Sequence, residues 1–146
     1  MQFSSNFNFF QFVTHKHSTP IHEWKGSFRD EPAEFRFTSV TGHVYGLDFT
    51  KEYNSWDIDP VKLFEAKTIK LESNPKMRLI HHLQSAAKGV DYLVLWLDCD
   101  REGENICFEV IENCLPSMKH PQNGGKMSHV YRAKFSGTGR LKNEIV

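Results

Sequence analysis

The segment from Asp91 to Leu115 constrains the fold more than any other part of the sequence. Its first residues, 91–97, read DYLVLWL, an apolar run without alternation that is typical of a strand covered on both faces of a parallel sheet. An acidic turn follows, and then one helical stripe, which stops before Pro116 and consists of Ile106, Cys107, Val110, Ile111, Cys114 and Leu115. A buried strand that leads directly into a helix predicts an α/β layered fold.

Other segments supply weaker expectations of the same kind. Asn74-Pro75 predicts the start of a helix that runs to Gly89, because a capping side chain there precedes a proline at the first helical position. Alternation and turn-forming residues predict a strand over 34–40, a loop over 51–72 with one short helix over 61–66, a loop over 121–126 and a last strand over 129–135.

Composition limits the classes of protein to consider. With 146 residues the chain has room for one domain. Lysine plus arginine and aspartate plus glutamate each number 18, so there is no global positive field to attract nucleic acid. The three cysteines form no CxxC pair, which argues against a zinc or redox site and favours a reduced, intracellular protein. No apolar run is long enough to span a membrane, and the protein is not expected to have a membrane as a partner.

The candidate site is the run Asp98-Cys99-Asp100-Arg101-Glu102-Gly103-Glu104-Asn105 between the expected strand and helix. In parallel sheets, ligands collect where strands end and the following helices begin. Asp98 and Asp100 can point the same way on extended chain, and Glu102 can join them as the chain turns. Three converging carboxylates repel one another unless a cation binds. Mg²⁺ is the expected ion, because it prefers oxygen ligands and phosphate, while Arg101 can place positive charge on that phosphate.

An acidic loop before a helix is common, and two aspartates at this spacing are weak evidence alone. The full run is more specific, and it resembles the acidic motif of Toprim domains, in particular those of type IA DNA topoisomerases. The resemblance extends from about Ile21 to Ser136, and it rests on the segments 37–43, 47–49, 53–54, 56–57, 59–60, 63–64, 74–76 and 131–136. It implies a Toprim-like, Rossmann-like parallel sheet flanked by helices, with part of the domain missing.

The same resemblance assigns roles to individual residues. Asp98, Asp100 and Glu102 are expected to be the catalytic, magnesium-binding acids. Arg101, His43, Arg132 and Lys134 are expected to contact nucleic acid. For the last three a plainer reading stays open. His43 can merely cap or pack the turn at Gly42, and alternating charges on a strand are usually its solvated face.

Parts of the family pattern are missing. The resemblance divides the chain into an unmatched Phe-rich segment (1–20), a partial Toprim domain (21–136) and an unmatched tail (137–146). The Glu-Lys-Pro-Ser type of strand that opens family members has no counterpart, and the four tyrosines lie in unrelated contexts, so the nucleophilic tyrosine is expected outside this chain. A truncated transcript, a divergent gene copy or an incomplete gene assembly would each explain this.

The activity implied for the parent protein is Mg²⁺-dependent cleavage and religation of single-stranded DNA through that tyrosine. RNA is a second candidate substrate, a protein with a Tudor domain is a candidate partner, and the nucleus, with the cytoplasm as a second compartment, is the expected location. Two alternatives stay open: a free-standing Toprim phosphoesterase or nuclease, and a non-catalytic interaction module.

Overall fold

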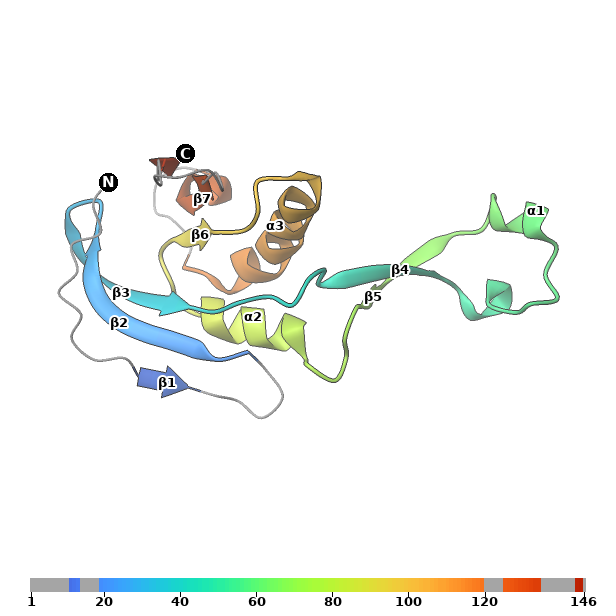
Figure 1. The fold of residues 1–146 in the computed structure, drawn as a ribbon, viewed down its shortest axis with the longest axis horizontal. Coiled ribbons are helices and arrows are strands. Elements are labelled where there is room, and N and C mark those ends of the chain that lie inside the picture. The colour runs from blue at the N-terminus through green and yellow to red at the C-terminus, as the bar shows by residue number, and fades with distance from the viewer. Residues whose placement is uncertain (1–10, 14–18, 120–124, 135–143, 146) are drawn as a thin grey trace.

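The computed structural model describes residues 11–13, 19–119, 125–134 and 144–145 (Figure 1). Four residues of the expected loop over 121–126, namely 121–124, lie outside these residues. The same holds for the last residue of the expected strand over 129–135 and for most of the Phe-rich start and of the tail. None of the helices in the described segments combines the length and apolar character that crossing a bilayer requires.

A small mixed sheet and two helices form the body of the molecule. Strand β6 (Leu93–Leu95) runs parallel to β7 (Val130–Lys134), which pairs antiparallel with β8 (Glu144–Ile145). Helices α2 (Leu79–Ala87) and α3 (Arg101–Cys114) pack together against β6 (Figure 1). The buried core residues are Val44, Leu79, Leu83, Ala87, Leu95, Ile106, Cys107, Val110, Cys114 and Met118. The parallel pair with its packed helices confirms the expected α/β class, and α3 carries the predicted stripe.

Coverage of β6 on both faces was expected, and this expectation is wrong for the described residues. Leu93, Leu95 and Leu97 contribute to the core, whereas Val94 and Trp96, on the opposite face, are 37% and 46% exposed. The helices that follow and precede β6 lie on the Leu95 side, and on the other face no helix of the described residues covers Val94 and Trp96.

An antiparallel sheet with the order β1-β2-β3 lies beside this body. It consists of β1 (Gln11–Val13), β2 (Ile21–Phe28) and β3 (Glu31–Phe37). The expected strand over 34–40 is confirmed as far as Phe37. Arg29 and Asp30 both have positive φ, 56° and 67°, and this two-residue loop matches the right-handed twist of the strands it joins.

Side chains tie this sheet to α2. The Nε2 atom of His82, a buried histidine of α2, lies 2.8 Å from the hydroxyl oxygen of Thr38 and 3.1 Å from that of Thr19. Arg36 of β3 donates to the main-chain oxygens of Ala86 and Lys88, which satisfies carbonyl groups at the end of the helix.

Helix α2 begins later than the sequence predicts. Residues 75–78 form a turn, and Arg78 has a left-handed conformation with a φ of 49°, which prevents a continuous helix from Pro75. The helix starts at Leu79, where the side chain of Glu72 accepts a hydrogen bond from the main-chain nitrogen of Ile80. Its end is as expected, because Gly89 has a φ of 71° and terminates the helix.

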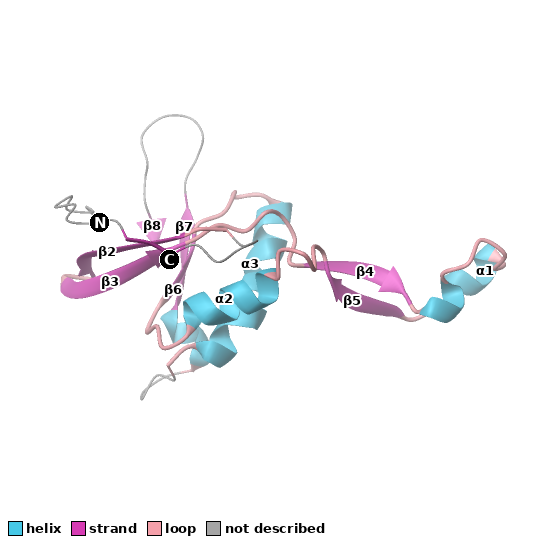
Figure 2. Ribbon diagram, turned by 90° about the horizontal axis from the view of Figure 1, so that it is seen from below, coloured by secondary structure: helices cyan, strands magenta, loops and turns pink. Residues whose placement is uncertain are grey.

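A long hairpin projects from the body as an arm (Figures 1 and 2). Its strands are β4 (Tyr45–Phe49) and β5 (Thr68–Glu72), and α1 (Pro60–Leu63) lies at its tip after a short 3-10 turn (Lys51–Tyr53). The expected helix over 61–66 is confirmed in part, but the expected loop is wrong over β5, which pairs with every residue of β4. Further 3-10 turns span Leu115–Ser117 and Lys126–His129, so the last expected strand begins at Val130.

Candidate functional site

The acidic turn lies where the sequence predicted it, between the end of β6 and the start of α3. Asp98, Asp100, Arg101 and Glu102 are all exposed. They therefore occupy the carboxyl end of a parallel strand and the amino end of the next helix, which is the edge of an α/β sheet at which ligands usually bind.

Asp100 begins α3. Its backbone is extended, and its Oδ1 atom accepts a hydrogen bond of 2.7 Å from the main-chain nitrogen of Gly103. An aspartate in this position satisfies one of the free amides of the first helical turn. Glu102 and Glu104 lie in that turn, where negative charge is favoured.

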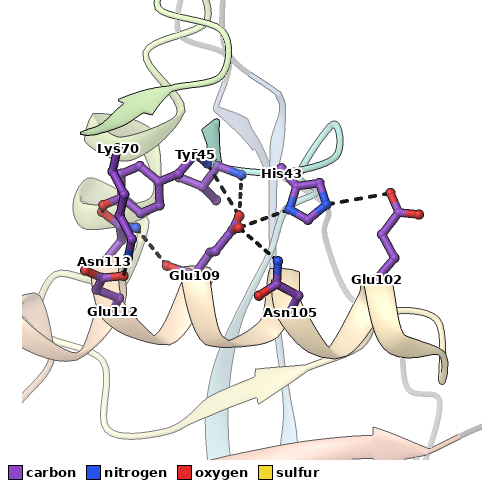
Figure 3. Close-up of polar contacts among 9 residues, drawn as sticks. His43, Tyr45, Lys70, Glu102, Asn105, Glu109, Glu112 and Asn113 are labelled. Atoms are coloured by element: carbon purple, nitrogen blue, oxygen red, sulfur yellow. Dashed lines mark hydrogen bonds and ion pairs between the residues drawn. The ribbon is translucent and has the colours of Figure 1, made fainter. Parts of the chain in front are cut away.

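The expected convergence of three carboxylates is not seen. No group of three or more histidine, cysteine, aspartate or glutamate side chains in the described part of the chain is arranged to hold a metal ion. The cap turns the carboxylate of Asp100 towards the amide of Gly103, while Glu102 projects from α3 towards His43, with 3.9 Å between Oε1 and Nε2 (Figure 3). The roles of Asp98, Asp100 and Glu102 as metal ligands stay predictions.

Gly103 lets the turn and the helix approach each other closely. A Cβ atom at this position would overlap the carbonyl oxygen of Asp98 and lie 3.3 Å from Oδ1 of Asp100. A side chain here would therefore push away the backbone of the acidic turn itself.

Arg132 of β7 ties this turn down. Its guanidinium donates to the main-chain oxygen of Asp98 at 2.8 Å and to Oε1 of Glu104 at 2.9 Å, and also to the carbonyls of Leu95 and Ala133. Burial disfavours the charged guanidinium, but the hydrogen bond that it donates to Glu104 and the neighbouring negative groups outweigh this effect, so the pKa of Arg132 is raised. Its side chain is 12% exposed, so it is not the solvated strand residue of the plainer reading.

The remaining candidate contacts to nucleic acid are placed differently. Arg101, at the first position of α3, and Lys134, at the end of β7, are exposed. His43 lies before β4 and faces α3 rather than only packing on the turn at Gly42 (Figure 3). The structure thus brings His43 and Arg132 to the acidic turn and leaves Lys134 at the surface.

A polar row on α3 joins the root of the arm to the body, and the sequence reasoning missed it. Glu109 contacts His43, while Asn113 accepts a hydrogen bond of 2.9 Å from the hydroxyl of Tyr45 (Figure 3). Glu112 pairs with Lys70 at 3.0 Å. The available signal was the spacing of Asn105, Glu109 and Asn113, since residues four apart share a helix face.

Between this row and the arm lies a cavity of about 450 Å³. His43, Tyr45 and Lys70 line one side of it, and Asn105, Glu109 and Glu112 of α3 line the other. The hydrogen bond and the negative charge of Glu112 raise the pKa of Lys70. The cavity lies near the acidic turn, because His43, which lines it, is 3.9 Å from Glu102.

Comparison with known proteins identifies the family. Residues 16–137 match the Toprim domain. DNA topoisomerase 3-beta of Arabidopsis thaliana is 52% identical over 127 residues, which are 86% of this chain. DNA topoisomerase 3-beta-1 of Homo sapiens is 52% identical over 118 residues, or 80% of this chain, and DNA topoisomerase 3-beta of Drosophila melanogaster is 54% identical over 118 residues, or 79%.

These relatives are much longer than the chain. The match covers 14% of the Arabidopsis and human proteins and 13% of the Drosophila protein. The resemblance to type IA topoisomerases that the acidic run and its surroundings indicated is confirmed, and among them it is a resemblance to topoisomerase 3-beta. With a match over most of its length, the chain belongs to the Toprim domain family.

Proposed function

We propose that this chain is the Toprim part of a type IA DNA topoisomerase of the 3-beta kind. In that enzyme a tyrosine outside these residues would attack a phosphodiester of single-stranded DNA, and the acidic turn would hold the phosphate and Mg²⁺ during cleavage and religation. The observation that carries the proposal is the position of the turn, at the end of β6 and the start of α3, within a segment 52% identical to DNA topoisomerase 3-beta.

The donor set suits Mg²⁺ by its chemistry. Asp98 and Glu102 are exposed carboxylates, and Asp100 uses only Oδ1 in its cap. Mg²⁺ is usually held by one or two carboxylates together with water and phosphate oxygens, so a site can form here without a preformed cage. When bound, the ion would neutralise charge on the reacting phosphate.

The residues of the chain prepare this place for a phosphate. The free amides at the start of α3 favour an anion, and Arg101 adds an exposed positive charge there. Arg132 and Gly103 hold the turn against the helix, so the carboxylates start from a defined backbone. Preorganisation of this kind lowers the cost of ordering the site when substrate binds.

The proposal extends to the substrates and surroundings of the parent protein. Single-stranded DNA is the proposed substrate, supported by relatives that are named DNA topoisomerases. RNA as a second substrate, a partner with a Tudor domain, and a location in the nucleus and the cytoplasm belong to the proposal on the strength of that resemblance. The nucleic-acid contacts proposed for this chain are Arg101, His43, Arg132 and Lys134.

A chimera tests the proposal. The matching segment of DNA topoisomerase 3-beta from Arabidopsis would be replaced by residues 16–137 of this chain, and relaxation of negatively supercoiled DNA would be measured with and without Mg²⁺. We expect Mg²⁺-dependent relaxation, which Asp98→Asn and Glu102→Gln each reduce strongly. A folded chimera without activity would refute the proposal.

The purified chain provides the complementary assay. Alone it is expected to leave supercoiled plasmid intact, because the nucleophile lies elsewhere. Metal-dependent nicking that Asp98→Asn abolishes would instead support a free-standing phosphoesterase. An active chimera whose relaxation is unchanged by both carboxylate substitutions would point to a scaffold role for the turn.

A further inference from the structure

Glu109 of α3 holds His43 from one side. One carboxylate oxygen, Oε1, lies 3.0 Å from Nδ1 of His43 and 3.4 Å from the side-chain nitrogen of Asn105. The other oxygen accepts hydrogen bonds from the main-chain nitrogens of Val44, at 2.7 Å, and Tyr45, at 3.5 Å. All four contacts converge on one carboxylate, whose side chain is only 13% exposed (Figure 3).

In the neutral imidazole of His43, this contact fixes which ring nitrogen carries the proton. A carboxylate only accepts hydrogen bonds, so Nδ1 must be the donor. Nε2 is then the nitrogen that faces the acidic turn, 3.9 Å from Oε1 of Glu102. Contacts of this kind commonly select the tautomer and the orientation of a functional histidine.

We propose that Glu109 is a positioning residue for His43: it holds the ring with Nδ1 protonated so that Nε2 faces the phosphate site formed by the acidic turn. The phosphate in this statement rests on the function proposed above, whereas the choice of tautomer does not. The His43 side chain is 37% exposed, so burial alone does not fix its ring, and the contact with Glu109 has to do so.

A purely structural role is the competing explanation, because Glu109 also binds the root of the arm through Val44. Two other contacts already anchor that root, namely the Lys70 pair with Glu112 and the hydrogen bond from Tyr45 to Asn113. The test must therefore separate the state of the His43 ring from the attachment of the arm.

Glu109→Gln makes this separation. The amide oxygen of glutamine can still accept from the nitrogens of Val44 and Tyr45, while its NH₂ group then faces Nδ1 and donates to it. The tautomer of His43 should therefore switch to one with the proton on Nε2. We would measure it by ¹⁵N–¹H correlation of the imidazole at alkaline pH, with His43→Gln to identify the signal among the eight histidines of the chain.

The wild-type spectrum should show Nδ1 protonated, and the Glu109→Gln spectrum should show Nε2 protonated. The control, Glu112→Gln, removes a carboxylate one turn along the same helix and should leave the His43 signals unchanged. A wild-type ring protonated on Nε2 would overturn the proposal without any variant, and so would a tautomer that does not respond to Glu109→Gln.

The chimera described above supplies the functional measurement. Glu109→Gln should lower relaxation by about 10- to 100-fold, the loss seen when the residue that orients a metal-bound histidine is removed, and Glu112→Gln should not. The double variant His43→Gln/Glu109→Gln should be no worse than His43→Gln alone. Fully additive losses would overturn the positioning role. An inactive wild-type chimera would refute only the proposed function, because the tautomer would still be decided by the spectra.

Discussion

Substitution of Gly103 by alanine has two opposite effects on the free energy of unfolding. Gly103 lies in the first turn of α3, where helix propensity alone predicts that alanine stabilises the chain by up to about 1 kcal/mol. The structure predicts the opposite, because the new Cβ atom would overlap the carbonyl oxygen of Asp98 and lie 2.9 Å from its carbon. The sign of the change therefore tests whether the turn really packs against the helix.

The size of the loss follows from what the methyl group meets. Overpacking costs about 1–3 kcal/mol when neighbours must move, and here the neighbour is main chain rather than a flexible side-chain end. The Asp98 carbonyl is also held by Arg132 at 2.8 Å, and a displaced carbonyl would weaken a hydrogen bond from a charged group, worth roughly 1.5–3 kcal/mol. After the gain in helix propensity we expect a net loss of about 2 kcal/mol.

Urea denaturation followed by circular dichroism would measure this loss. Gly46→Ala is the matched control, because the nearest atom to its new Cβ would be Oγ of Ser73 at 3.9 Å, an ordinary contact. It should change the free energy of unfolding by no more than about 0.5 kcal/mol. A Gly103→Ala chain as stable as the wild type, or more stable, would refute the close packing of turn and helix.

Three further outcomes follow from the same structure. Leu83→Ala, in the core at 4% exposure, should lower the free energy of unfolding by about 2–5 kcal/mol, whereas Leu47→Ala, at 72% exposure on the arm, should leave it nearly unchanged; equal losses would contradict the assigned core. Burial raises the pKa of the Cys114 thiol from 9.0 to about 12. The Cys114 thiol therefore ionises at lower pH in the unfolded chain than in the folded one, so the free energy of unfolding should fall as the pH rises from about 9 towards 12. Urea denaturation at a series of pH values should show a smaller fall for Cys114→Ala than for the wild type. Arg132→Lys keeps the charge but loses the forked set of hydrogen bonds, and should cost about 1–3 kcal/mol in the same urea assay; an unchanged midpoint would show that the guanidinium does not hold the acidic turn.

The sequence predicted the elements whose signals are local. The apolar run before the acidic turn and the stripe from Ile106 to Leu115 define β6 and α3, and both are present. The end of α2 follows from Gly89, which takes the positive φ that an L side chain resists. The position of the acidic turn between β6 and α3 is confirmed for the same reason, because it depends only on where a strand gives way to a helix.

Features that depend on distant contacts were missed. β5 reads as a loop by itself and becomes a strand only through its pairing with β4. The loop Arg29-Asp30 lacks the glycine that usually marks such a turn, so the hairpin of β2 and β3 was not foreseen as a unit. The contact between Glu109 and His43 joins residues 66 positions apart, and the spacing of α3 alone does not reveal its partner.

The side-chain directions in the acidic turn were also beyond the sequence. The alternation of side chains on an extended chain predicted that the carboxylates of Asp98 and Asp100 lie side by side. It did not take into account that the first amides of α3 need a hydrogen-bond acceptor. Oδ1 of Asp100 accepts a hydrogen bond from the main-chain nitrogen of Gly103. The cap uses Oδ1 of Asp100, so an ion would have to bind through the other oxygen of this carboxylate.

Calorimetric titration of the purified chain with Mg²⁺ tests the central claim most directly, that the acidic turn binds this ion. The variant Asp98→Asn/Asp100→Asn removes two charges but keeps a helix cap, because asparagine caps as well as aspartate does. Asp57→Asn/Asp59→Asn makes the same change in charge on the arm, where Asp59 caps α1. We predict that the wild type and the arm variant bind Mg²⁺ alike, with affinity lost only in the turn variant. No binding to the folded wild type, or equal binding by all three, would contradict the account.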